Sequence, residues 1–325
     1  MSLGSISRAW PARLRVGLAA LVLLALIAVI GPFISADPNA ILDPREASLL
    51  PPGAQRTVLH RRDGTSIAAQ SAVRTSESWQ VVRQGRKEEL PATEVVGVES
   101  RHFLLGTDTV GRDVLARLLS GARVSLSVGA LALLVALVLG VGIGVVAGWT
   151  GGWIDSVLMR LVDALLAVPM LFLLLFLAAV FRPSLGMLVA ILGFSSWMGV
   201  ARLVRGQVLS LKQREFILAA RALGASPLRI AVFHLIPNAL TPLAQDAALR
   251  LGDLILVEAA LSYLGLGVQP PIASWGNIVS EGQEVLAVAW WLTFVPAALI
   301  AVTVVGAALA ADGLQQLARA DEGVR

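Results

Sequence analysis

The chain has 325 residues, of which 56% are apolar and only 15% carry a charge. This composition indicates an integral membrane protein rather than a soluble one. The net charge is only +4 and the basic residues lie beside apolar segments, so we expect no nucleic-acid partner. The absence of cysteine excludes disulfides and cysteine-based metal sites.

Six segments are apolar and long enough to cross a bilayer as helices, which takes roughly 20 residues. They are Val16–Ala36, Val124–Gly148, Val157–Phe181, Leu185–Val204, Asn238–Leu261 and Val285–Ala311. The first segment could alternatively be a cleaved signal peptide. It is long for that role, however, and Ile34-Ser35-Ala36 is a poor cleavage site. We therefore predict an all-α polytopic membrane protein with six transmembrane helices.

The orientation follows from basic residues in the connections, which favour the cytoplasmic side. Such residues precede the first span and fill the insert between the fourth and fifth: Arg8, Arg13, Arg15, Arg202, Arg205, Lys212, Arg214, Arg221 and Arg229. The short connections 182–184 and 262–284 carry only Arg182. We therefore expect the insert and both termini to be cytoplasmic, and residues 37–122 to lie outside.

The insert between the fourth and fifth spans reads EFILAARALGASPLRIAVFHLIP from Glu215 to Pro237. Residues 214–223 are good helix formers, and Gly224 suits the left-handed residue that ends a helix. Ser226 can cap a second helix whose first turn accepts Pro227. The sequence predicts two helices meeting at a sharp turn. The small side chains of the first would let another protein approach, although an ordinary surface helix is the alternative.

This insert resembles the "EAA" loop of ABC-importer permeases, with Glu, two Ala, Gly four residues later and Pro thirteen residues after that. The matching residues are Glu215, Ala219, Ala220, Gly224 and Pro237. The resemblance implies that the loop, residues 205–237, docks on a cytoplasmic ATPase and couples ATP hydrolysis to transport.

The predicted external segment shows strand and turn signals. Residues 57–62 and 65–68 flank Asp63-Gly64, and residues 79–83 precede Gln84-Gly85, so we expect two β-hairpins in a small external β-rich insert. This insert could dock a solute-binding protein or be a mere linker.

The block from His102 to Gly129 resembles the stretch that leads into the second span in permeases for dipeptides, oligopeptides and nickel. We expect an amphipathic surface helix there, with structural roles for Asp108, Arg112 and Asp113.

The segment from Glu258 to Val279 matches the same family, and its glycines and prolines predict irregular backbone at the outer mouth of a pathway. Trp275, Trp290 and Trp291 suit interfacial anchoring.

The spans also carry charges, which are costly in a membrane. Candidate pathway residues are Asp246, Arg250, Asp253 and Glu258. We expect Arg250 to neutralise Asp246 and Asp253, whether as a substrate contact or as a purely structural network.

Other patterns within the spans are interpreted as structural. Arg160 and Asp163 are expected to pair, and Pro169 to kink the third span. Gly140, Gly144 and Gly148 suit close helix packing rather than a nucleotide loop.

The three blocks together resemble the second, "C-type" permease of the dipeptide, oligopeptide and nickel importers. The family implies a type I permease fold, with residues 1–36 forming the N-terminus and first helix, 37–122 the external module and 123–325 a five-helix core. It further implies a second homologous permease in a heterodimer, two cytoplasmic ABC ATPases that use ATP and Mg, an extracytoplasmic solute-binding protein and a bacterial cytoplasmic membrane. Peptides are the expected cargo; nickel or another small solute is the alternative.

Two other functional classes are alternatives to a permease. An ion-driven secondary transporter would show inverted repeats, which are not evident in the sequence. A membrane enzyme would need clustered catalytic groups, but His60, His102 and His234 are scattered. We therefore expect no catalytic residue, no metal site and no cofactor bound by this chain.

Overall fold

The computed structural model describes residues 10–181 and 184–322. It contains two compact units. The first unit comprises the described residues up to Leu24, Leu126–Leu261 and those from Ile300 onward. The second comprises Ala25–Ser125 and Ser262–Leu299. Arg8 and Arg182, which helped to predict the orientation, lie outside the described residues.

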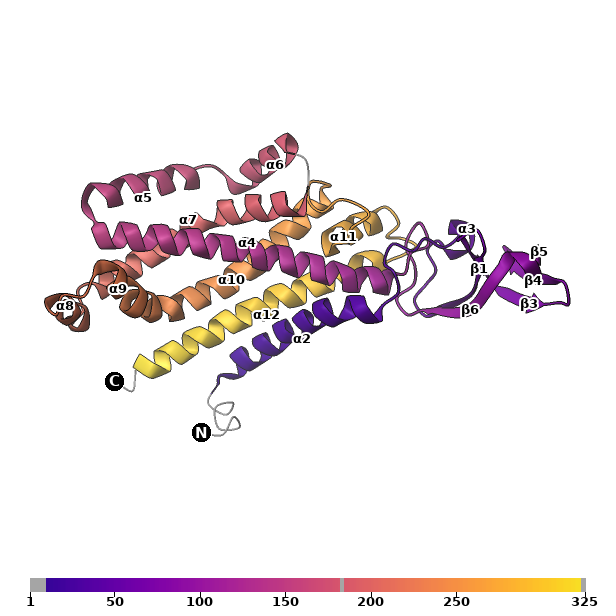
Figure 1. Ribbon diagram of the computed structural model, residues 1–325, viewed down its shortest axis with the longest axis horizontal. Helices are drawn as coiled ribbons and strands as arrows, with labels where there is room; N and C mark the ends of the chain where they lie inside the picture. The colour runs from indigo at the N-terminus through magenta and orange to yellow at the C-terminus, as the bar shows by residue number, and fades with distance from the viewer. Residues whose placement is uncertain (1–9, 182–183, 323–325) are drawn as a thin grey trace. The chain divides into compact units, whose positions relative to one another are not determined.

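Helices make up most of the chain (Figure 1). Their bounds are α2 (Ala12–Ile34), α3 (Pro44–Ala47), α4 (Val114–Thr150), α5 (Gly152–Leu166), α6 (Met170–Val180), α7 (Leu185–Leu211), α8 (Glu215–Ala222), α9 (Pro227–Ile230), α10 (Ile236–Tyr263), α11 (Trp275–Gln283) and α12 (Trp291–Glu322). A π-helical turn, η2 (Ala231–Leu235), joins α9 to α10, and a 3-10 turn, η1 (Ala92–Glu94), precedes the last strand.

Among the described residues, α2, α4, α7 and α12 are long and apolar enough to cross a membrane. The predicted count of six spans is therefore not confirmed. The third predicted span is divided into α5 and α6, because the chain leaves the helix before Pro169 (Figure 1). The fifth coincides with α10, where Asp246, Arg250 and Asp253 occur together in every 18-residue stretch. In the third predicted span, the helix is therefore interrupted at Pro169 rather than only kinked there.

Helices α4 and α7 approach closely along a seam of glycines. A Cβ added at Gly140, Gly144 or Gly148 would collide with Val200, Val204 or Val208, respectively. Both sets repeat every four residues, so the ridge of one helix fits the groove of the other. The predicted packing role of these three glycines is confirmed.

We expect Gly144→Ala to destabilise the protein by about 1–3 kcal/mol, because the new methyl group would overpack the seam. Its Cβ would lie 2.7 Å from the carbonyl oxygen of Ala201 and 2.8 Å from Cβ of Val204. Thermal unfolding of the purified protein in detergent measures the effect. The control is Gly142→Ala on the same helix, where nothing lies within 4 Å. Equal losses in both variants would contradict this account of the seam.

Residues 54–103 form two small sheets in the second unit. Strands β1 (Ala54–Arg61), β2 (Ser66–Ala69) and β6 (Val95–Phe103) pair in the order β2-β1-β6, and β3 (Ser71–Arg74), β4 (Ser78–Arg83) and β5 (Arg86–Pro91) in the order β3-β4-β5. Both expected hairpins, β1-β2 and β4-β5, are present and antiparallel. The turn at Asp63-Gly64 is fixed by Thr65, whose hydrogen bonds lower the pKa of the Asp63 carboxyl. The external position of these sheets stays a prediction.

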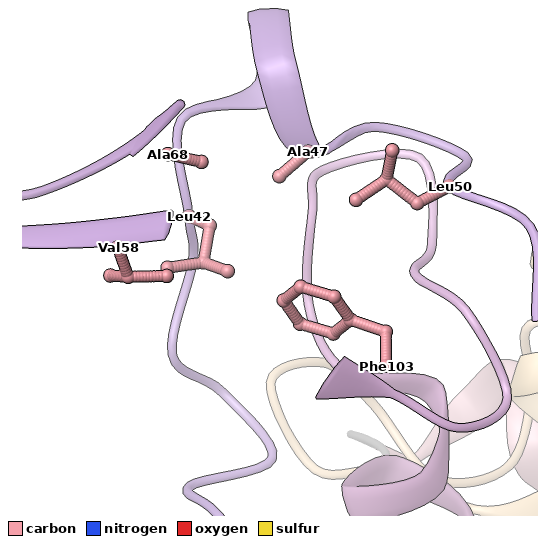
Figure 2. Close-up of a cluster of buried hydrophobic side chains, with 6 residues drawn as sticks. All are labelled: Leu42, Ala47, Leu50, Val58, Ala68 and Phe103. Atoms are coloured by element: carbon pink, nitrogen blue, oxygen red, sulfur yellow. The ribbon is translucent and has the colours of Figure 1, made fainter. Parts of the chain in front are cut away.

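A compact apolar cluster joins this segment's first sheet to α3. Figure 2 shows its six side chains, which come from α3, the first sheet and the chain beside them: Leu42, Ala47, Leu50, Val58, Ala68 and Phe103. Asp43 caps α3 and also pairs with Arg83 of β4. The segment therefore has a core of its own rather than the character of a bare linker.

A buried ion cluster lies at the start of α4. Arg117 donates to Asp108 at 2.5 Å and to both carboxylate oxygens of Glu281 on α11, at 2.5 and 2.8 Å. Arg112 donates to Asp108 at 2.6 Å and to Glu281 at 3.2 Å. Asp113 caps α4 by accepting from the backbone of Leu115 at 2.9 Å, and burial raises the pKa of its carboxyl. The expected structural roles of Asp108, Arg112 and Asp113 are thus confirmed.

Two expectations for this region are wrong. The separate amphipathic helix does not form, because its residues are the first turns of the continuous helix α4. Trp275 and Trp291 are not interfacial anchors, since both are buried. The indole N–H of Trp275 donates to the carbonyl of Leu118 at 3.2 Å. The expected irregular backbone does occur between α10 and α11, where Gly265 has a positive φ of 75°.

We expect Glu281→Gln to destabilise the protein by about 2 kcal/mol, because it leaves Arg112 and Arg117 with one carboxylate between them. Arg117 is the more sensitive of the two, since its side chain is only 3% exposed. The measurement is again thermal unfolding in detergent. Glu284→Gln, at an exposed position just after α11, is the matched control and should change little. If Glu281→Gln is as stable as the control, the ion cluster does not contribute to the stability of the protein.

Candidate functional site

The predicted turn between two helices is present at Gly224 (Figure 1). Gly224 has φ +77°, and its N–H donates to the carbonyl of Arg221 at 2.9 Å, while Ala225 donates to Ala220 at 3.0 Å. These two bonds form the Schellman arrangement that ends a helix at a left-handed residue. Ser226 then accepts from the N–H of Arg229 at 3.3 Å, and Pro227 occupies the first turn of α9. We call α8, α9 and the turn between them the elbow.

The inner face of the elbow is fixed to α7. Ile217 of α8 and Ile230 of α9 are both fully buried, in one cluster with Val204 and Val208. Val200, Val204 and Val208, the valines of the glycine seam between α4 and α7, belong to this cluster. The elbow is therefore packed directly on the seam.

Polar contacts hold the neighbouring helix ends together. The guanidinium of Arg221 lies 4.2 Å from the ring centroid of Trp149 on α4, a cation–π contact. Lys212 donates to the carbonyl of Gly148 at 3.0 Å. Arg205 donates twice to Asp155 of α5, at 2.5 and 2.7 Å, and this hydrogen bonding lowers the pKa of the Asp155 carboxyl. Sequence reasoning missed Trp149 and Asp155, because their partners lie more than 45 residues away and no local pattern connects them.

The elbow and the adjoining turn η2 expose several large apolar side chains. We call these side chains the apolar elbow surface: Phe216, Leu218, Leu223, Leu228, Val232 and Phe233. Leu223 is 88% exposed, more than any other large apolar side chain of the described chain. Glu215, Ala219, Gly224 and Pro237 are also exposed, whereas Ala220 is partly buried against the inner cluster. The five motif residues thus share one stretch, four of them on its surface.

The elbow joins α10 through the π-helical turn η2. Ile236 donates to the carbonyl of Ala231, five residues back. Pro237 has no N–H to continue the ordinary helical pattern, and the side chain of Asn238 donates to the carbonyl of His234 at 2.6 Å. The position of Pro237 therefore coincides with the change from a π-helical turn to regular helix.

A cavity of about 380 Å³ lies between α7, α10, α5 and α6 within the first unit. Its polar wall includes Ser195, Ser196, Gly199, Arg250 and Asp253, and the rest is aliphatic. Arg250 pairs with Asp246 and donates to the carbonyl of Ser196 at 3.2 Å. Of the four candidate pathway residues, Arg250 and Asp253 line the cavity and Asp246 holds Arg250. Glu258 is buried and is not among the lining residues.

Two expected ion pairs need correction. Arg250 pairs with Asp246 but not with Asp253 in the ion pairs found among the described residues. Asp163 pairs with Arg202 of α7 rather than with Arg160 of its own helix. A basic side chain on the adjacent helix can approach the carboxylate directly, which a rule based on helical spacing cannot detect. Within residues 10–181 and 184–322, no His, Cys, Asp and Glu side chains gather as a metal site would require.

Comparison with known proteins gives a consistent match. The family model described as "Binding-protein-dependent transport system inner membrane component" matches residues 140–320. The oligopeptide transport system permease protein OppC of Escherichia coli K12 is 44% identical over 218 residues, covering 67% of this chain and 72% of that protein. The dipeptide transport system permease protein DppC of the same strain is 46% identical over 216 residues, covering 66% and 72%.

Among solved structures, a chain of the MetNI methionine ABC transporter in inward-facing conformations matches with a TM-score of 0.46 and 21% identity. The match covers 57% of this chain and 90% of that chain.

We expect Ile217→Ala to loosen the elbow, because it empties a fully buried site, with a cost of about 2–4 kcal/mol. Hydrogen exchange of residues 215–235 should speed up, and the melting temperature in detergent should fall. The control is the adjacent Leu218→Ala, whose side chain is 51% exposed and should matter little to stability. If both variants exchange at the rate of the unmodified protein, the elbow is not anchored through Ile217.

Proposed function

This chain belongs to the family of binding-protein-dependent transport system inner membrane components, the permease subunits of ATP-driven ABC importers, and we propose that its cargo is di- or oligopeptides. The names of relatives at 44% and 46% identity support this choice, since both are peptide permeases. The match covers 72% of each of those relatives. Residues 140–320, which the family model matches, include the elbow and the cavity.

The apolar elbow surface is the observation that carries the proposed mechanism. A loop that faces water and exposes six large apolar side chains is suited to bind a protein partner. In this proposal the partner is a cytoplasmic ATPase, one of two that bind ATP and Mg. Glu215, Ala219, Ala220 and Gly224 form the docking helix and its end, and Pro237 sets where α10 begins.

The inner face explains how docking could move the spans. When the ATPases close, force applied to α8 would pass through Ile217 and Ile230 into α7 and its tightly packed partner α4. Because packed helices shift as rigid bodies, the spans would rock between inward-open and outward-open states. This arrangement requires a cytoplasmic elbow and cytoplasmic termini, as the distribution of basic residues predicts.

The remaining assembly is proposed from the family. A second homologous permease completes a heterodimer, and a solute-binding protein delivers cargo from outside the bacterial cytoplasmic membrane. The sheet segment of residues 54–103, with its own apolar cores, is a suitable docking surface for that protein. Asp246, Arg250, Asp253 and Glu258 are proposed to line or support the path through the membrane.

We expect Leu223→Glu to lower ATP-driven uptake at least about tenfold, because it puts a charge at the most exposed position of the apolar elbow surface. The side chain is almost fully exposed, so the folded subunit should be unaffected. The measurement is uptake of labelled trialanine by the assembled transporter in proteoliposomes, together with its ATPase rate.

The matched control is Leu104→Glu, which changes another exposed leucine, 64% exposed, in the second unit. It should leave uptake close to normal. Normal uptake by Leu223→Glu would show that the elbow is not the docking site. Failure of the unmodified transporter to import trialanine would instead count against peptides as cargo.

A further inference from the structure

Two charged residues, Arg250 and Asp253, line the cavity of the first unit. Asp246, which is not among the lining residues, pairs with Arg250. The guanidinium is held by Asp246 and by the carbonyl of Ser196, so its charge is already compensated. Asp253 is exposed, lines the cavity and takes part in none of the ion pairs found among the described residues.

The position of Arg250 is fixed by the packing around it. A Cβ added at Gly199 would lie 3.1 Å from Cζ of Arg250 and closer still to one of its terminal nitrogens. The guanidinium therefore occupies the space that a side chain on α7 would fill. The guanidinium of Arg250 therefore stays paired with Asp246, and Asp253 lies about one helical turn further along α10.

The rest of the wall is aliphatic: Leu166, Leu174, Leu192, Leu254 and Val257. A lone carboxylate in such a wall favours a cation that brings apolar groups with it, because the cation can pair with the carboxylate while the apolar groups contact the aliphatic wall. A primary ammonium attached to an aliphatic group meets both requirements. A carboxylate ligand would be repelled by Asp253 and would find Arg250 already neutralised.

We propose that this cavity is a subsite for the ammonium group of the cargo, with Asp253 as its counter-ion and the aliphatic wall around the adjoining side chain. The inference rests on the proposed function, because the ammonium group would be the free amino end of a peptide. The permease itself would then prefer peptides with a free amino end over N-acylated ones.

The experiment uses charge-selective labelling of a single cysteine in the assembled transporter. The chain has no cysteine, so Val257→Cys places the only thiol of this subunit in the cavity wall. Its reaction rates with the cationic trimethylammonioethyl and anionic sulfonatoethyl methanethiosulfonates are compared with those of free mercaptoethanol. We expect the cationic reagent to be favoured by about fivefold, and Asp253→Asn to remove the preference.

Asp163→Asn is the matched control, since it neutralises an acid of the same unit that does not line the cavity. It should leave the preference intact. Trialanine should slow labelling more than N-acetyl-trialanine does, and Asp253→Asn should abolish that difference. These readouts require no transport, so they are independent of the uptake assay for the proposed function.

Three results would overturn the subsite. The first is an equal preference for the cationic reagent in Val257→Cys with Asp253 present and with Asp253→Asn added. The second is equal protection by the two peptides. The third is failure of both reagents to react, which would show that a neighbouring subunit fills the cavity.

Discussion

The close approach of α4 and α7 determines where the other parts of the first unit can attach. Gly140, Gly144 and Gly148 let the backbone of α4 reach Val200, Val204 and Val208. Between helices in a membrane, association depends on such packing, because lipid is as apolar as the side chains. The same valines continue into the cluster that holds Ile217 and Ile230, so the seam and the base of the elbow form one packed body.

Helix α7 joins this body to the cavity. Val208 contacts the elbow cluster, whereas Ser196 lines the cavity twelve residues earlier, about 18 Å along the helix axis. A rigid helix that is packed at one end against the proposed docking surface and at the other against the cavity can carry a displacement between them.

Local rules predicted the elbow well because each step depends on one residue and its immediate neighbours. Gly224 ends α8 through its positive φ, and Ser226 with Pro227 starts α9. Helical spacing predicted the pair of Arg250 with Asp246, but it could not find Arg202 and Arg205, whose partners lie on a different helix. The start of α4 was misread because an amphipathic stretch and the first turns of a long helix have the same pattern. Trp275 was misread because composition cannot separate a buried tryptophan from one at the membrane interface.

The polar character of α10 has a consequence for the whole assembly. Hydropathy alone would reject this helix as a span, because Asp246, Arg250 and Asp253 are too close together. A pair such as Arg250 with Asp246 lowers the cost of burial, but an exposed Asp253 facing lipid would remain expensive. This side of α10 must therefore face water or protein rather than lipid. The apolar elbow surface shows the opposite mismatch, since its leucines face the aqueous side in the proposed topology. A polar patch within the spans and an apolar patch outside them both indicate a subunit whose surfaces are completed by other chains.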